Sequence, residues 1–140
     1  MNPFSLIYFS ITHIYKEVFP MNIDEIQIHS EKIENIYVMR VEGVINSLTH
    51  QKFFDEVKHS NRRGGLIIDM EEVVVISSVG IDVLKKVSDL SYTSGNKIVL
   101  LNLSSHVKQV LGMLGLLKIF NIAPNEELAM KMVSKTAVVK

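Results

Sequence analysis

The sequence predicts a single α/β domain built on a mixed, largely parallel sheet of about five strands packed with about four helices. Two observations predict this fold class. Short apolar runs of strand length alternate along the chain with segments whose apolar residues recur at helical spacing. The 140 residues suit one domain, and an apolar content of 47% is enough to form a core.

The first part of the domain predicts two strands and a helix. Ile23 to Ile33 and Ile36 to Gly43 both alternate apolar and polar residues, which is typical of half-buried strands. We expect these two strands to form a hairpin or lie side by side, and Gly43 to end the second one. Ser47 is the expected N-cap of a helix over Leu48 to Ser60.

The middle of the chain predicts another strand and helix. Leu66 to Met70 and Val73 to Ile76 are apolar runs that count as one buried strand region, interrupted by a brief turn at Glu71 and Glu72. Gly80 to Ser91 carries apolar residues at helical spacing, and Gly95 is well placed to end that helix.

The last part predicts two more strands, each followed by a helix. Lys97 to Leu103 is a buried strand, and Ser104 or Ser105 caps the helix after it. Lys118 to Ala123 is a short edge strand, and Pro124 with Asn125 opens a final helix.

The two ends of the chain differ from the domain, which we expect at 21–135. Residues 1–20 form an apolar extension, and 136–140 form a frayed tail. The extension lacks the basic start and cleavage site of a secretory signal, and its apolar run is too short for a membrane span. It predicts a helix on the core, a tail upstream of the domain, or an interfacial helix that could form a homodimer.

Several function classes find no support in the sequence. Fifteen basic and fifteen acidic residues give a formal net charge of zero, which does not favour nucleic acid as a partner. The chain has no cysteine, no glycine-rich phosphate loop and no paired histidine spacing of a metal site. No catalytic residue, metal or cofactor is predicted, and we do not expect an enzyme.

The segment "ISSVG" holds the candidate functional residues. Ser77 and Ser78 fall where a strand gives way to a helix, and helix starts have free N–H groups that favour negative charge. A serine there can serve as a plain helix cap, or it can carry a phosphate that those groups stabilise. Gly80 is expected to leave space for a partner to approach. The residues alone leave both interpretations open.

Three stretches of sequence resemble the STAS domain family of bacterial anti-sigma factor antagonists. They are "VEGVINSLTHQKF", "LIIDMEEVVVISSVGIDVLKKVSDL" and "GNKIVLLNLSSHVKQVLGMLGLLKIFNI". The resemblance covers about Asn22 to Val133 and implies a STAS-like fold. It also implies that Ser78 is the serine that a partner kinase phosphorylates, with Asp69 as a structural residue near the site. Ser77 and Asn46 stand where many members carry Asp.

The function implied by this resemblance is that of a cytoplasmic anti-sigma factor antagonist. It would bind an anti-sigma factor with serine kinase activity and release a sigma factor, and phosphorylation of Ser78 would weaken that binding. One alternative is a non-phosphorylated STAS scaffold module of a stress-signalling or lipid-transport complex. Another is a domain that binds a small ligand or nucleotide, and the absence of a phosphate loop speaks against it. The expected partner-binding residues are Asn46, Ser47, Ser77, Ser78, Val79, Gly80 and Ile81.

Overall fold

The computed structural model describes residues 25–134. The expectations for the apolar extension 1–20, for dimerisation through it and for the tail 136–140 lie outside these residues. Within the described range, no helix combines the length and the apolar character that a membrane crossing requires.

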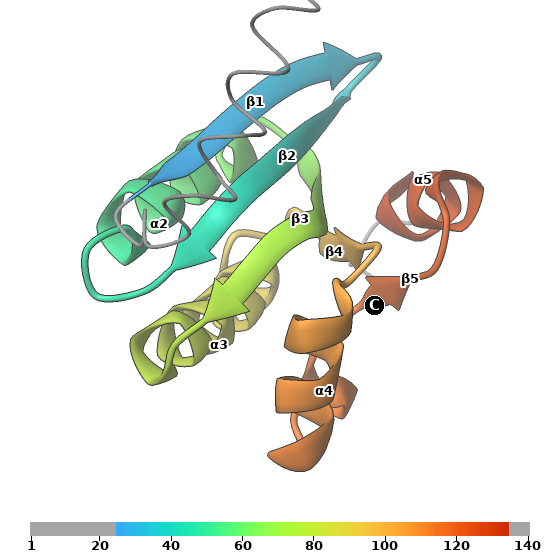
Figure 1. The fold of residues 1–140 in the computed structure, drawn as a ribbon. Coiled ribbons are helices and arrows are strands. Elements are labelled where there is room, and N and C mark those ends of the chain that lie inside the picture. The colour runs from blue at the N-terminus through green and yellow to red at the C-terminus, as the bar shows by residue number, and fades with distance from the viewer. Residues whose placement is uncertain (1–24, 135–140) are drawn as a thin grey trace, which may run out of the picture.

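Strands and helices follow one another in the predicted order (Figure 1). The strands are β1 (Ile26–Ile33), β2 (Ile36–Ile45), β3 (Gly65–Ile76), β4 (Ile98–Leu101) and β5 (Ile122–Ala123). The helices are α2 (His50–Asn61), α3 (Ser78–Thr93), α4 (Ser105–Met113) and α5 (Glu126–Ser134), with a 3-10 helix η1 (Leu117–Ile119) before β5.

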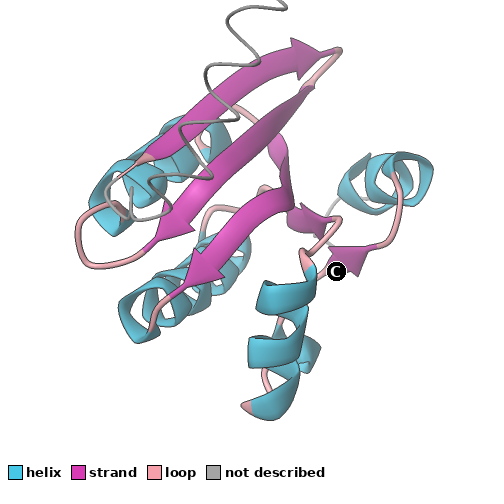
Figure 2. Cartoon of the chain, viewed as in Figure 1, coloured by secondary structure: helices cyan, strands magenta, loops and turns pink. Residues whose placement is uncertain are grey.

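The five strands form one sheet in the order β1-β2-β3-β4-β5 (Figure 2). β1 runs antiparallel to β2 as a hairpin, and the turn between them places Glu34 at a φ of 58°. The other neighbouring pairs are parallel. This confirms the predicted mixed, largely parallel sheet.

Helices cover the sheet unequally on its two faces. α2, α3 and α4 pack on one face, where Phe53, Leu84 and Leu111 join the larger core cluster (Figure 1). α5 packs alone on the other face, where Ala129 and Val133 join a smaller cluster. β3 and β4 lie between these layers, so their central residues are buried on both sides.

β2 shows the predicted alternation but runs further than expected. Met39 and Val41 face the larger cluster, while Ile36 and Val38 face the smaller one. Gly43 does not end the strand, which continues to Ile45. Its φ of 113° accompanies a register shift toward β3, so this glycine permits an irregularity within the strand.

The predicted turn at Glu71 and Glu72 is wrong, because β3 is one continuous strand of 12 residues. The two acids are exposed residues within the strand, and they lie next to a register shift between β2 and β3. The predicted edge strand from Lys118 is also shorter. Only Ile122 and Ala123 pair with β4, because η1 takes up Lys118 and Ile119, and Phe120 and Asn121 connect η1 to the strand.

Candidate functional site

Ser77 is the N-cap of α3. It follows β3 directly and has an extended backbone with φ −91° and ψ 176°. Its Oγ accepts a hydrogen bond from the Gly80 N–H at 3.3 Å, and its carbonyl oxygen accepts one from the Ile81 N–H at 2.9 Å. The first bond satisfies an N–H group that a helix start otherwise leaves free, and the second is the first regular hydrogen bond of the helix.

Ser78 is the first residue of α3 and is exposed. None of the residues 25–134 makes a hydrogen bond to its Oγ, or to the N–H groups of Ser78 and Val79. The two serines therefore differ in what they do. Ser77 caps the helix, which leaves the hydroxyl of Ser78 free in solvent at the positive end of the helix dipole.

The start of α3 lies beside the end of β2. The Ser77 N–H donates to the Ile45 carbonyl oxygen at 3.0 Å, which joins the two segments. The residue after Ile45 is Asn46, so the structure brings Asn46 and Ser47 to the same edge of the sheet as Ser78. This is the edge at which the parallel strands β2 and β3 end, and loops at such edges commonly carry binding sites.

Asn46, rather than Ser47, organises the start of α2. The Asn46 Oδ1 accepts from the N–H groups of Leu48 at 2.9 Å and Thr49 at 3.1 Å. The buried Thr49 hydroxyl donates to the Val44 carbonyl oxygen at 2.6 Å and accepts from the Asn46 N–H at 3.0 Å. The predicted cap at Ser47 is wrong, because an asparagine side chain reaches the N–H groups two and three residues on and fixes the turn first.

Gly80 and Ile81 are buried, in contrast to the expectation that they face a partner. A Cβ on Gly80 would lie 2.5 Å from the Ile45 carbonyl oxygen and 2.6 Å from Ile76 Cγ1. Gly80 therefore lets α3 approach the end of β2, and it does not open space for a partner. Ile81 is 4% exposed and belongs to the larger core cluster.

Asp69 lies away from the start of α3. It is seven residues before the end of β3, which corresponds to about 20 Å along an extended strand. Its Oδ1 accepts from the Glu71 N–H at 3.1 Å, and its Oδ2 lies 3.9 Å from Arg40 Nε. The expectation that it sits near the site is wrong, because β3 continues past the turn that the sequence predicted there.

Exposed apolar residues near Ser78 were missed by the sequence prediction. Leu48 is 64% exposed in the loop after β2, and Val74 and Val75 are 59% and 45% exposed near the end of β3. The run of three valines predicts burial, yet only Val73 of the three is buried. Val74 and Val75 lie beside a register shift between β2 and β3 that falls at Gly43, and no sequence signal other than that glycine marks it.

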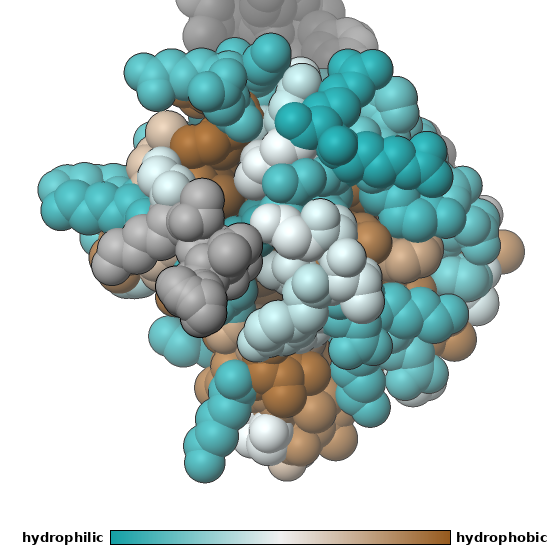
Figure 3. Space-filling model, turned by 180° about the vertical axis from the view of Figure 1, so that it is seen from behind, coloured by the Kyte–Doolittle hydropathy of each residue, from teal (hydrophilic) through white to brown (hydrophobic). Residues whose placement is uncertain are grey.

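A second group of exposed apolar side chains lies elsewhere. Met113 on α4 is 79% exposed, and Leu114 directly after that helix is 57% exposed. Seen from behind, hydrophobic residues gather at the lower end of the molecule, where α4 lies (Figure 3). This group belongs to a different helix and is separate from the apolar residues around Ser78.

Few charges stand close to Ser78 along α3. The first turn of α3 has no acidic residue. Asp82 follows one turn later, with its Oδ1 4.0 Å from Lys85 Nζ. Within residues 25–134, no group of three histidine, aspartate or glutamate side chains is arranged to hold a metal ion.

These features define a small mixed α/β domain that presents a helix start at one edge of its sheet. The family model of the STAS domain matches residues 27–129. The chain belongs to the STAS domain family.

Known proteins similar to this chain are named as anti-sigma factor antagonists. BtrV, a candidate anti-sigma factor antagonist of Bordetella bronchiseptica, is 28% identical over 101 residues, which are 71% of this chain and 87% of BtrV. The crystal structure of an anti-sigma factor antagonist from Mycobacterium paratuberculosis has a TM-score of 0.69 at 21% identity and covers 79% of this chain and 95% of its own.

A third similar protein has been solved in a phosphorylated form. The Bacillus cell fate determinant SpoIIAA in that form has a TM-score of 0.57 at 16% identity, and covers 76% of this chain and 99% of its own. At such identities the two solved structures establish the fold alone. The family match and the relative BtrV therefore make this chain a STAS domain with homologues named as anti-sigma factor antagonists.

Proposed function

We propose that this protein is an anti-sigma factor antagonist whose binding is switched by phosphorylation of Ser78. Unmodified, it binds an anti-sigma factor with serine kinase activity, and the sigma factor held by that partner is released. The observation that carries the proposal is that the two neighbouring serines have different roles. Ser77 caps α3 through Gly80, while the hydroxyl of Ser78 is exposed and has no partner among residues 25–134.

The surface around Ser78 suits a protein partner. Leu48, Val74 and Val75 expose apolar side chains at the ends of β2 and β3, beside the start of α3. Asn46 and Thr49 fix the loop that carries Leu48 through side-chain hydrogen bonds. An apolar area on a loop that is already ordered loses little conformational entropy when a partner covers it.

A phosphate on Ser78 would be stable within the protein and unfavourable in the complex. It adds a charge of about −1.5 to −2 at neutral pH. The free N–H groups of Ser78 and Val79 and the dipole of α3 favour that charge in the unbound protein. A partner packed against the apolar side chains nearby would have to desolvate the phosphate, so binding weakens.

The differences from the family pattern at Ser77 and Asn46 should affect the rate at which Ser78 is phosphorylated more than the choice of Ser78 as the phosphorylated residue. Both positions lack the carboxylate that many members carry there. A phosphate on Ser78 therefore meets less repulsion. A kinase or its magnesium ion that uses those carboxylates loses contacts, so we expect slower phosphorylation than in members that have them.

Incubation with the cognate anti-sigma kinase and ATP, followed by intact mass measurement, tests the proposal. We expect one added phosphate on the wild-type chain, one on Ser77→Ala, and none on Ser78→Ala. No mass gain on the wild type would count against the switch. In that case, co-purification with a large stress-signalling or transport complex would favour the scaffold function instead.

A further inference from the structure

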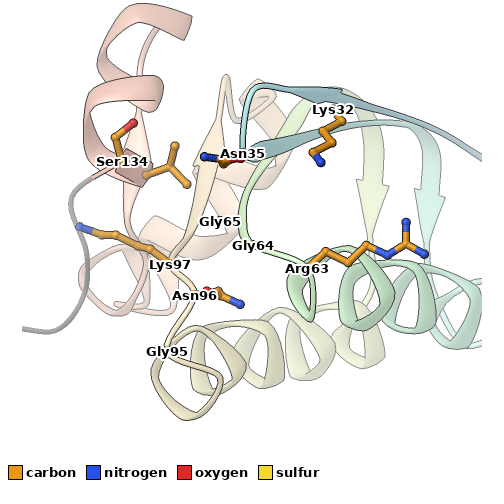
Figure 4. Close-up of a pocket in the computed structure, with 10 residues that line it drawn as sticks. Lys32, Asn35, Arg63, Gly64, Gly65, Gly95, Asn96, Lys97 and Ser134 are labelled. Carbon is orange, nitrogen blue, oxygen red and sulfur yellow. The ribbon is translucent and has the colours of Figure 1, made fainter.

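A cavity of about 310 Å³ lies at the opposite end of the sheet from Ser78 (Figure 4). It is formed where β1 turns into β2, where β3 and β4 begin, and where α5 ends. Since β3 spans 12 residues, about 35 Å of strand separates this cavity from the start of α3. Its volume is near the lower limit for small-molecule sites, which is about 300 Å³.

Among residues 25–134, the cavity is lined by three cations and by no acid. Lys32 comes from the end of β1, Arg63 from the turn after α2, and Lys97 from the residue before β4. None of the three has a carboxylate within 4.0 Å among residues 25–134, and Lys32 Nζ instead lies 5.8 Å from the centre of the Tyr37 ring. Three unneutralised positive charges around one hollow attract an anion.

The cations stand at the rim of the cavity. In Figure 4, Lys32 and Arg63 lie on one side of the first residues of β3, and the side chain of Lys97 extends on the other. All three are long side chains that can reorient toward a ligand. A ligand that contacts all three cations must carry more than one negatively charged group.

Polar groups between the cations complete the lining. Asn96 is fixed, because its Nδ2 donates to the Asn61 carbonyl oxygen at 2.7 Å and its own carbonyl oxygen accepts from Asn61 Nδ2 at 2.9 Å. The exposed Asn35 amide makes no hydrogen bond with residues 25–134 and is available as a donor. The lining therefore combines a hydrogen-bonded wall with long cationic side chains.

The lining offers little to an apolar or aromatic group. Within the described part of the chain, no aromatic residue lines the cavity, and Val133 contributes the single apolar side chain. The backbone is open at Gly95, where a Cβ would meet nothing within 4 Å. Recognition at this site would depend on charge and hydrogen bonds, because the Tyr37 ring beside Lys32 is not among the lining residues.

We propose that this cavity binds a small molecule through a diphosphate group. Lys32 and Arg63 contact one phosphate, Lys97 contacts the other, and the Asn35 amide donates a hydrogen bond between them. The ligand is recognised by its phosphates alone, whether it is free pyrophosphate or the diphosphate part of a larger molecule. This site is independent of the proposed switch, because it shares no residue with the start of α3.

Titration with pyrophosphate, followed by amide chemical shifts and calorimetry at about 100 mM salt, tests the proposal. We expect saturable binding with shifts centred on Gly64, Gly65 and Gly95. The double variant Lys32→Gln, Arg63→Gln should bind roughly tenfold more weakly. The matched control Lys108→Gln, Lys118→Gln removes two exposed cations from α4 and η1 and should bind as the wild type does.

A parallel titration with ADP distinguishes the sources of the diphosphate. An affinity within a few-fold of that of pyrophosphate supports recognition by phosphates alone. An ADP affinity more than tenfold higher would contradict it, because it would require contacts to the nucleoside. Absence of saturable pyrophosphate binding, or equal weakening in both double variants, would overturn the site.

Discussion

The carbonyl oxygen of Ile45 accepts the Ser77 N–H at 3.0 Å, and this bond holds the start of α3 against the end of β2. It places the capping serine, the exposed Ser78 and the Asn46 loop at one edge of the sheet. The close approach also depends on Gly80, whose missing side chain leaves room for the same carbonyl oxygen.

The substitution Gly80→Ala should destabilise the protein by about 1–3 kcal/mol. The added Cβ would lie 2.5 Å from the Ile45 carbonyl oxygen, and backbone atoms cannot move aside as a side chain does. Urea denaturation followed by circular dichroism measures the change. Gly112→Ala is the matched control, because its Cβ would meet only Leu117 Cδ1 at 3.6 Å, and helix propensity predicts a gain of about 0.5–1 kcal/mol. A Gly80→Ala variant as stable as the wild type would contradict this packing.

The two serines should differ in their effect on stability. Ser77→Ala removes the cap of α3 and should cost about 1 kcal/mol. Ser78→Ala removes an exposed hydroxyl with no partner among residues 25–134, and should change stability by less than about 0.5 kcal/mol. The same denaturation experiment compares both. Equal losses would mean that Ser78 also supports the fold, and its freedom for modification would be in doubt.

The loop that carries Leu48 should depend on the hydroxyl of Thr49. Thr49→Val leaves the Val44 carbonyl oxygen and the Asn46 N–H without that hydroxyl, in a region where Thr49 is 2% exposed. We expect a loss of about 1–3 kcal/mol. Thr49→Ser keeps the hydroxyl and should lose clearly less. If valine and serine behave alike, the hydrogen bonds do not determine the loop.

Leu48 should contribute to partner binding without supporting the fold. Its side chain is 64% exposed, so Leu48→Ala should leave the unfolding midpoint nearly unchanged. Affinity for the anti-sigma factor should fall about tenfold if Leu48 is buried at the centre of the interface. Tyr92→Ala is the control, since Tyr92 is 76% exposed near the other end of α3, about 20 Å from Ser78. Similar losses for both variants would argue against a surface centred on Ser78.

Much of the fold could be predicted from the sequence because its signals are local. The alternation in β2 assigns Met39 and Val41 to one face and Ile36 and Val38 to the other, as the structure has them. The helical spacing from Ile81 to Leu90 identifies the buried side of α3. The positive φ of Gly95, 78°, agrees with its predicted place after that helix.

The errors arose where two segments distant in the sequence determine the result. Gly80 looks like an opening in the sequence, and only the position of Ile45 shows that its lack of a side chain serves packing. Glu71 and Glu72 look like a turn, but pairing with β2 keeps them in the strand and moves Asp69 away from Ser78. Val74 and Val75 are exposed beside a register shift that only Gly43 marks in the sequence.

One comparison tests the central claim most directly. It measures the affinity of the anti-sigma factor for the unmodified full chain and for the full chain that carries phosphoserine at position 78. Both forms can be compared by calorimetry at the same salt concentration and without ATP, so that the partner cannot phosphorylate the unmodified form. We predict that the phosphorylated form binds at least tenfold more weakly while its unfolding midpoint is equal or higher. Equal affinities for the two forms would contradict the claim that one exposed hydroxyl at the start of α3 controls the complex.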